Sequence, residues 1–196
     1  MKKLFSLLFA ICFLAIASYS ATFAGWDPAE EEQERKAAEE TIATFKEKDP
    51  SMERFFDEAW GYAVYPTVGT GALIVGGAHG TGLVYKSVRI SLLMHPYQSK
   101  GKIVGRSKLS QGTVGLQAGG QSYSEIIFFK DKTAFDTFKD GKLKLAAKAS
   151  AIAVKAGSSA DVAYDGGVAV FTMGKGGLML QAAVGGQTFT FEPKPK

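Results

Sequence analysis

The sequence predicts an α+β fold, in which an N-terminal helical arm packs on a glycine-rich antiparallel β-sheet that can curl into a barrel. Two observations predict this fold. Residues 27–58 contain 12 acidic and 5 basic residues, with apolar residues at helical spacing. Residues 59–124 contain no Asp or Glu, hold 13 of the 23 glycines and consist of short β-branched or aromatic runs. The net charge of +4 therefore hides an acidic segment beside a basic one, and a basic surface attracts anionic partners.

The first residues have the pattern of a secretory signal peptide. Lys2 and Lys3 precede an apolar run of 14 residues, at 4–17, which is shorter than the roughly 20 residues that span a bilayer. Small residues favour cleavage between Ala24 and Gly25, so we expect residues 1–24 to be removed and the chain to be exported to the periplasm or cell envelope of a bacterium. An uncleaved membrane anchor is the alternative.

The mature chain is expected to contain no thiol, because Cys12 is the only cysteine and lies within this leader. Disulfides, a thiolate nucleophile and cysteine-ligated metals are thereby excluded. The remaining 172 residues are enough for one hydrophobic core. We predict one globular unit made of an acidic helical arm at 25–58 and a β-rich domain at 59–192, followed by a frayed tail at 193–196.

Two helices are predicted in the arm. Asp27 is a suitable N-cap with Pro28 in the first turn, and Ala38 and Phe45 recur at helical spacing. Residues 49–51, with the sequence Asp-Pro-Ser, are expected to end this helix and to begin a second, short one. The simplest interpretation of the acids is a solvated helix face opposite an apolar stripe.

The β-rich domain contains several predicted strands and one helix. Glycine-separated runs of β-branched or aromatic residues at 72–75, 83–85, 88–92 and 124–129 predict strands. Residues 131–140 predict a short helix, because its two phenylalanines lie three residues apart and therefore share a side.

Residues 143–154 satisfy two periodicities. A helix would gather Leu145, Ala149 and Ile152 on one side, whereas a strand would place six apolar residues on one face. The strict alternation and a turn at 157–159 leading to residues 162–164 favour a hairpin, so we predict a strand here, with a helix as the alternative. On the opposite face of that strand lie three bases: Lys142, Lys144 and Lys148.

The glycines of the domain are predicted to be structural. The glycine cluster at 69–82 is followed neither by Gly-Lys-Ser/Thr nor by a helix, so it fits neither a phosphate-binding loop nor a dinucleotide-binding loop. Turns, bulges and close backbone approaches are the better explanation. The glycines concerned are Gly71, Gly76, Gly77, Gly80, Gly82, Gly119 and Gly120.

Candidates for catalysis are few. His79 and His95 are the only histidines, and no acid lies within the surrounding run to complete a metal site. We expect His79 to be a turn residue beside Gly80. Glu125, the first acid after the run, is expected to pair with a base, with a buried functional carboxylate as the alternative. The sequence therefore predicts no enzymatic activity, no cofactor and no metal ion.

A basic surface is the main functional candidate. Four bases lie close together and would attract an anionic membrane by about 1 kcal/mol each, namely Lys100, Lys102, Arg106 and Lys108. Further basic contacts are possible at Lys86, Arg89, Lys142, Lys144 and Lys148. A merely solvated loop is the alternative. Nucleic acid is not an expected partner, because the mature charge would be only +2.

Six motifs follow one another in an order that resembles the SYLF domain family. They are Ala59–Pro66, Gly71–Val84, Gly115–Gly120, Ser124–Phe129, Val168–Phe171 and Gly177–Met179. The resemblance spans residues 29–191 and implies a lipid-binding module. Eukaryotic relatives bind phosphoinositide-containing membranes, and fungal ones also bind actin. The arm is acidic here from Glu30 to Glu40, and Val184-Gly185-Gly186 stands where the family often has Leu-Glu-Gly. We therefore expect neither actin nor phosphoinositides as partners.

These inferences predict an exported, non-catalytic protein that binds anionic phospholipid at a membrane surface. A structural or partner-binding envelope protein, whose basic rim meets its own or another protein's acidic arm, is the alternative. The third hypothesis is an enzyme, and it requires Glu125 and His79 to share one polar pocket.

Overall fold

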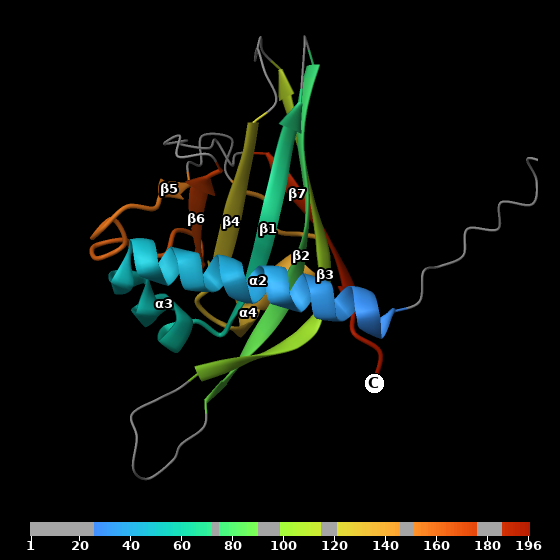
Figure 1. Cartoon of the computed structure of the whole chain (residues 1–196), viewed down its shortest axis with the longest axis horizontal. Helices are drawn as coiled ribbons and strands as arrows, with labels where there is room; N and C mark the ends of the chain where they lie inside the picture. Colours follow the sequence, from blue (N-terminus) through green and yellow to red (C-terminus); the bar gives the residue numbers. More distant parts are fainter. Residues whose placement is uncertain (1–25, 72–74, 90–98, 115–120, 146–150, 176–185) are drawn as a thin grey trace, which may run out of the picture.

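The computed structural model describes residues 26–71, 75–89, 99–114, 121–145, 151–175 and 186–196 (Figure 1). The helices of the arm are α2 (Pro28–Lys48), the 3-10 turn η1 (Pro50–Met52) and α3 (Glu53–Glu58). Asp27 accepts a hydrogen bond from the Ala29 N–H, and Asp49 both ends α2 and caps η1. The two predicted helices are thus confirmed, while the leader and the cleavage site at Ala24 and Gly25 lie outside the described residues.

Seven strands form one sheet in the order β5-β6-β4-β1-β2-β3-β7. Their bounds are β1 (Gly61–Gly71), β2 (Val75–Arg89), β3 (Ser99–Val114), β4 (Gln121–Phe129), β5 (Ile152–Ala153), β6 (Val168–Gly174) and β7 (Gln187–Pro193). All neighbours are antiparallel except β5 and β6, which are parallel. Residues 154–167 join them, which is long enough for the crossover that a parallel pair needs. The α+β class is confirmed, but the described sheet is mixed and does not close into a barrel.

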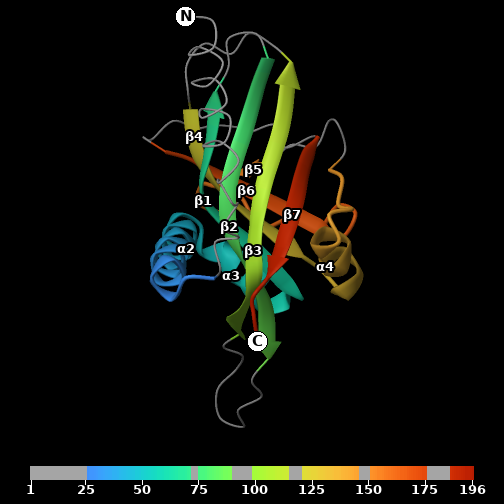
Figure 2. The same ribbon diagram turned by 90° about the vertical axis from the view of Figure 1, so that its right-hand side faces the viewer.

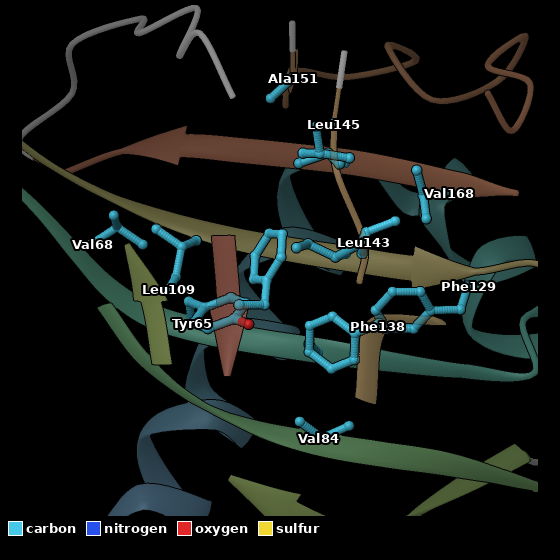
Figure 3. Packing of buried hydrophobic residues seen from close by; sticks show 14 of the residues in the cluster. Tyr65, Val68, Val84, Leu109, Phe129, Phe138, Leu143, Leu145, Ala151 and Val168 are labelled. Atoms are coloured by element: carbon cyan, nitrogen blue, oxygen red, sulfur yellow. The ribbon is translucent and has the colours of Figure 1, made fainter. Parts of the chain in front are cut away.

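Helices cover both faces of the sheet: α2 and α3 lie on one side, and α4 (Lys132–Lys139) lies on the other (Figure 2). Because side chains alternate along a strand, each face buries its own apolar cluster. On the α2 side, α3 contributes Phe55, which packs against Phe128 and Phe171. On the α4 side, Phe138 packs against Phe129 (Figure 3) and also contacts the Phe189 ring. The helix predicted at 131–140 is confirmed, with Asp131 as its N-cap.

Glycines in β2 lie where neighbouring atoms leave little room. A Cβ added at Gly82 would overlap the Val64 carbonyl oxygen and the Tyr65 ring, and one at Gly80 would come within 2.9 Å of Val68 Cγ2. A Cβ added at Gly77 would lie 3.2 Å from His79 Nε2. Of the other glycines predicted to be structural, Gly71 and Gly76 lie in β1 and β2, whereas Gly119 and Gly120 lie outside the described residues.

The strand predicted at residues 143–154 is largely wrong. Residues 142–145 have no regular structure, 146–150 are outside the described part, and only the two residues of β5 are a strand. The alternation instead comes from an extended segment that buries Leu143 and Leu145 against the α4-side cluster. Residues 162–164, predicted to pair in a hairpin, are not a strand either.

The expected tail at residues 193–196 is partly ordered. β7 continues to Pro193, and the Lys194 N–H donates to the Val104 carbonyl oxygen at 2.9 Å. The side chain of Lys194 also forms an ion pair with Glu31 of α2. The end of β7 is therefore tied to both the sheet and the arm.

Candidate functional site

The four bases predicted to form one rim all lie on β3, but they do not share a face. Gly105 pairs with Val84 whereas Ile103 pairs with Tyr85, so Val104 is an extra residue that forms a bulge. A bulge moves all later side chains to the other face. Lys102 therefore lies on the α4 side of the sheet, and Arg106 and Lys108 lie on the α2 side. For Lys100 the structure describes only the strand register, in which Lys100 pairs with Val88.

One end of the β2–β3 ladder combines basic and exposed apolar side chains. Lys86 pairs with Lys102, and Val88 shares the face of Lys86 because the two are two residues apart. The Lys86 Nζ lies 5.5 Å from the centroid of the Trp60 ring. Trp60 is 38% exposed and Val88 is 39% exposed, and they are the exposed large apolar residues of the described chain. We call Trp60, Lys86, Val88 and Lys102 the β2–β3 tip. It begins where Lys86 pairs with Gly61, the first residue of β1, and from there the β2–β3 ladder extends past the other strands (Figure 1).

Arg106 is held by the acidic arm. Its guanidinium lies 2.6 Å from Glu34 and 3.5 Å from Glu30, and it stacks on the Trp26 ring at 4.3 Å. Lys194 approaches the same ring at 5.8 Å and pairs with Glu31. Hydrogen bonds from Lys194 and Trp26 lower the pKa of Glu31. We call this group the α2 clasp; it leaves only 11% of the Arg106 side chain exposed.

Two adjoining hollows lie between α2 and the sheet. The first, of about 510 Å³, is lined partly by Glu34, His79 and Lys108. The second, of about 840 Å³, is lined partly by Lys48 of α2 and by Lys155 and Lys175, which follow β5 and β6. Both hollows share Ala37, Pro66 and Thr67. We call the two together the α2 groove. His79 is an exposed residue in the middle of β2, so the prediction of a turn at this position is wrong.

The remaining predicted bases are dispersed. Lys142 pairs with Asp140 at 2.9 Å just after α4, and Lys144 is exposed nearby. Arg89 pairs with Ser99 in the β2–β3 ladder. Lys148 and His95 lie outside the described residues.

Glu125 is a fully buried carboxyl group on the α4 side of the sheet. Burial raises its pKa to about 8, although a hydrogen bond from Gln187 acts in the opposite direction. The Gln187 Nε2 donates to Oε2 at 3.1 Å, while Oε1 has no partner within the described structure. The expected ion pair is not formed with any described base. Leu83, four residues after His79 on β2, belongs to the α2-side cluster, whereas Ile127, two residues after Glu125 on β4, belongs to the α4-side cluster. His79 and Glu125 therefore lie on opposite faces of the sheet and do not share a pocket.

The described residues contain no cluster of three or more His, Cys, Asp or Glu side chains that could hold a metal ion. Within the same part of the chain, no helix combines the length and the apolar content needed to cross a membrane.

Comparison with known proteins identifies the domain. Residues 110–194 match the Ysc84 family model, which is described as "Las17-binding protein actin regulator". Beta cell expansion factor A from Aeromonas veronii is 29% identical over 155 residues, which cover 76% of this chain and 51% of that protein. The chain thus spans about half the length of this curated relative. The resemblance to the SYLF domain family drawn from the six motifs is confirmed over residues 110–194, which match the family's Ysc84 model.

Proposed function

We propose that this protein is an exported, non-catalytic protein of the bacterial cell envelope, which binds the surface of anionic phospholipid membranes through the β2–β3 tip. One observation carries the proposal. Exposed Trp60 lies beside Lys86, and exposed Val88 shares a face with Lys86 and Lys102, in a segment without a single acid. Tryptophan favours the membrane interface, and lysine is attracted to anionic headgroups.

The tip replaces the basic rim as the proposed contact. Lys102 stays in the contact set, and Lys100 and Arg89 belong to the same end of the ladder. Arg106 is already paired with α2, and Lys108 lies on the opposite face. Two to four cations contribute about 1 kcal/mol each near an anionic surface, so insertion of Trp60 is needed to make the binding stable.

Self-association through the acidic arm has less support. Glu30, Glu31 and Glu34 already bind Arg106 and Lys194 within the same chain, which leaves fewer acids for a second copy. We do not extend the actin regulation named in the family description to this chain, because its arm carries acidic residues along its first turns.

Vesicle flotation tests the proposed contact. We expect the protein to float with vesicles of phosphatidylglycerol and phosphatidylcholine and to stay behind with phosphatidylcholine alone. Lys86→Ser with Lys102→Ser should weaken binding roughly 30-fold, because two cations contribute about 2 kcal/mol together. Trp60→Ser should weaken binding at all salt concentrations, since its contribution is apolar.

A double variant with the same change of charge provides the control. Lys36→Ser with Lys132→Ser removes two exposed cations from α2 and α4 and should leave flotation unchanged. Equal binding to neutral vesicles, or equal losses in the two double variants, would show that the β2–β3 tip is not a specific contact with anionic lipid.

A further inference from the structure

We propose that the α2 groove binds one long-chain fatty acid, with its carboxylate beside Lys48, Lys155 and Lys175 and its acyl chain between α2 and the sheet. This is a binding site for a single amphiphile in water and is separate from the β2–β3 tip. The proposal does not depend on membrane binding.

The groove exists because one stripe of α2 carries small side chains. Ala37, Thr41 and Thr44 recur at intervals of four and three residues, and therefore lie on one side of the helix. Glu34 and Lys48 continue the stripe at its two ends. Larger residues at the three inner positions would fill the space between the helix and the sheet.

The wall of the groove is more apolar than polar, although several of its residues have hydroxyl groups. Thr41 Oγ1 donates to the Ala37 carbonyl oxygen and Thr44 Oγ1 to that of Glu40, both at 2.8 Å. Each threonine hydroxyl is thus bound to its own helix, and the methyl group is left to contact a ligand. The opposite side of the larger hollow is lined by Ala153, Val154 and Met173. An alkyl chain fits such a surface better than a polar molecule does.

The larger hollow has an excess of cations. Lys48, Lys155 and Lys175 line it, and none of them forms an ion pair with a residue in the described structure. Lys175 instead donates a hydrogen bond to Thr67 Oγ1, at the junction of the two hollows. Glu40 is the one acid in the described lining. A carboxylate placed among these lysines would gain charge-assisted hydrogen bonds.

The dimensions fit a long, thin ligand. Lys48 and Glu34 are 14 positions apart on α2, which corresponds to about 21 Å at the helical rise. Each hollow alone, of about 510 or 840 Å³, is within the range of roughly 300–1,000 Å³ that is typical of small-molecule sites, and the two together exceed it. The acyl chain would start in the larger hollow and continue past Ala37 into the smaller one.

Displacement of a fluorescent fatty acid, dansyl-undecanoate, tests this proposal with the full mature chain. We expect palmitate to displace the probe from one site per chain. Hexadecanol has the same alkyl chain without the charge and should bind at least tenfold more weakly. Lys155→Ser with Lys175→Ser should weaken palmitate at least tenfold and leave hexadecanol unchanged, because only the carboxylate contacts the lysines.

A pair of substitutions at Thr44 tests the location. Thr44→Trp should fill the groove and abolish binding of palmitate, whereas Thr44→Val keeps the methyl group and should retain it. Circular dichroism of both variants checks that α2 has formed. Lys86→Ser with Lys102→Ser alters the membrane contact and should bind palmitate normally, while Thr44→Trp should still float with anionic vesicles. The two proposals can therefore fail separately.

Four results would overturn the fatty-acid site: no saturable displacement by palmitate, equal affinity for hexadecanol, undiminished binding by Thr44→Trp, or displacement by a decaglutamate peptide as effective as that by palmitate. The last would assign the lysines to an acidic peptide instead.

Discussion

Replacing Asp49 by alanine is expected to destabilise the protein by about 2–3 kcal/mol at neutral pH. Asp49 is fully buried between the arm and the turn that follows β5. It accepts hydrogen bonds from the backbone of Ser51, Gly157 and Ser159, and from the Ser158 hydroxyl at 3.0 Å. Removing the carboxylate leaves these partly or fully buried donors without their acceptor.

The pH dependence of Asp49 provides a second readout. Burial alone would raise its pKa, but hydrogen bonds from Ser51, Ser159 and Ser158 outweigh it and lower the pKa well below the usual value. A depressed folded-state pKa gives stability that is fully present above the unfolded value of about 4 and is lost as the pH falls below it. Asp49→Asn should therefore be less stable than the wild type at pH 7 and lose less stability on acidification.

Urea unfolding followed by circular dichroism measures both effects. Asp161→Ala is a matched control, because Asp161 is an exposed acid in the same turn region, and it should change stability by less than about 0.5 kcal/mol. If Asp49→Ala unfolded at the same urea concentration as Asp161→Ala, the hydrogen bonds around Asp49 would not be important for stability.

Glu125→Gln is expected to make the protein more stable than the wild type above pH 8. The pKa of buried Glu125 is raised to about 8 from 4.5. Stability from such a group is fully present below the unfolded pKa and is lost as the pH rises through the folded pKa, here between about 4.5 and 8. The loss is at most about 5 kcal/mol, at 1.36 kcal/mol for each pKa unit. Glutamine has a similar shape, stays neutral and can still accept the hydrogen bond from Gln187.

Unfolding of wild type and Glu125→Gln at pH 5, 7 and 9 isolates this contribution, because the other titrating groups cancel in the difference. We expect the difference in unfolding free energy to change in favour of the variant as the pH rises. Glu192→Gln, at an exposed acid on β7, should follow the wild type at all three pH values. Parallel curves for the wild type and Glu125→Gln would mean that Glu125 does not titrate in this range.

Features that depend on neighbouring residues could be predicted from the sequence. Asp27 and Asp49 were recognisable as residues at helix boundaries, because each accepts a hydrogen bond from a backbone N–H two residues away. The strand at 124–129 was recognisable from its own composition. For Glu125, the sequence left two alternatives, an ion pair with a base and a buried carboxylate. The structure buries Glu125 and places no described base in an ion pair with it.

Features that depend on distant partners could not be predicted. The bulge at Val104 separates Lys102 from Arg106, but it follows from the register with β2 and leaves no mark in the sequence of β3 itself. The bonds of Asp49 to the turn at Ser159 join residues 110 positions apart. The α2 groove likewise requires α2, β1 and β6 together, although the small residues at 37, 41 and 44 were a signal that a helical projection would have shown.

The α2 clasp also has a consequence for the order in which the chain folds. Glu31 and Lys194 are separated by 163 residues, so their contact closes a very long loop. Such contacts form late, after nearer ones have shortened the effective separation. The N-terminal turns of α2 leave the ribosome before any strand, yet they are anchored only when β7 has joined the sheet. In refolding experiments, the amides near Glu34 should therefore gain protection from hydrogen exchange later than those near Phe45.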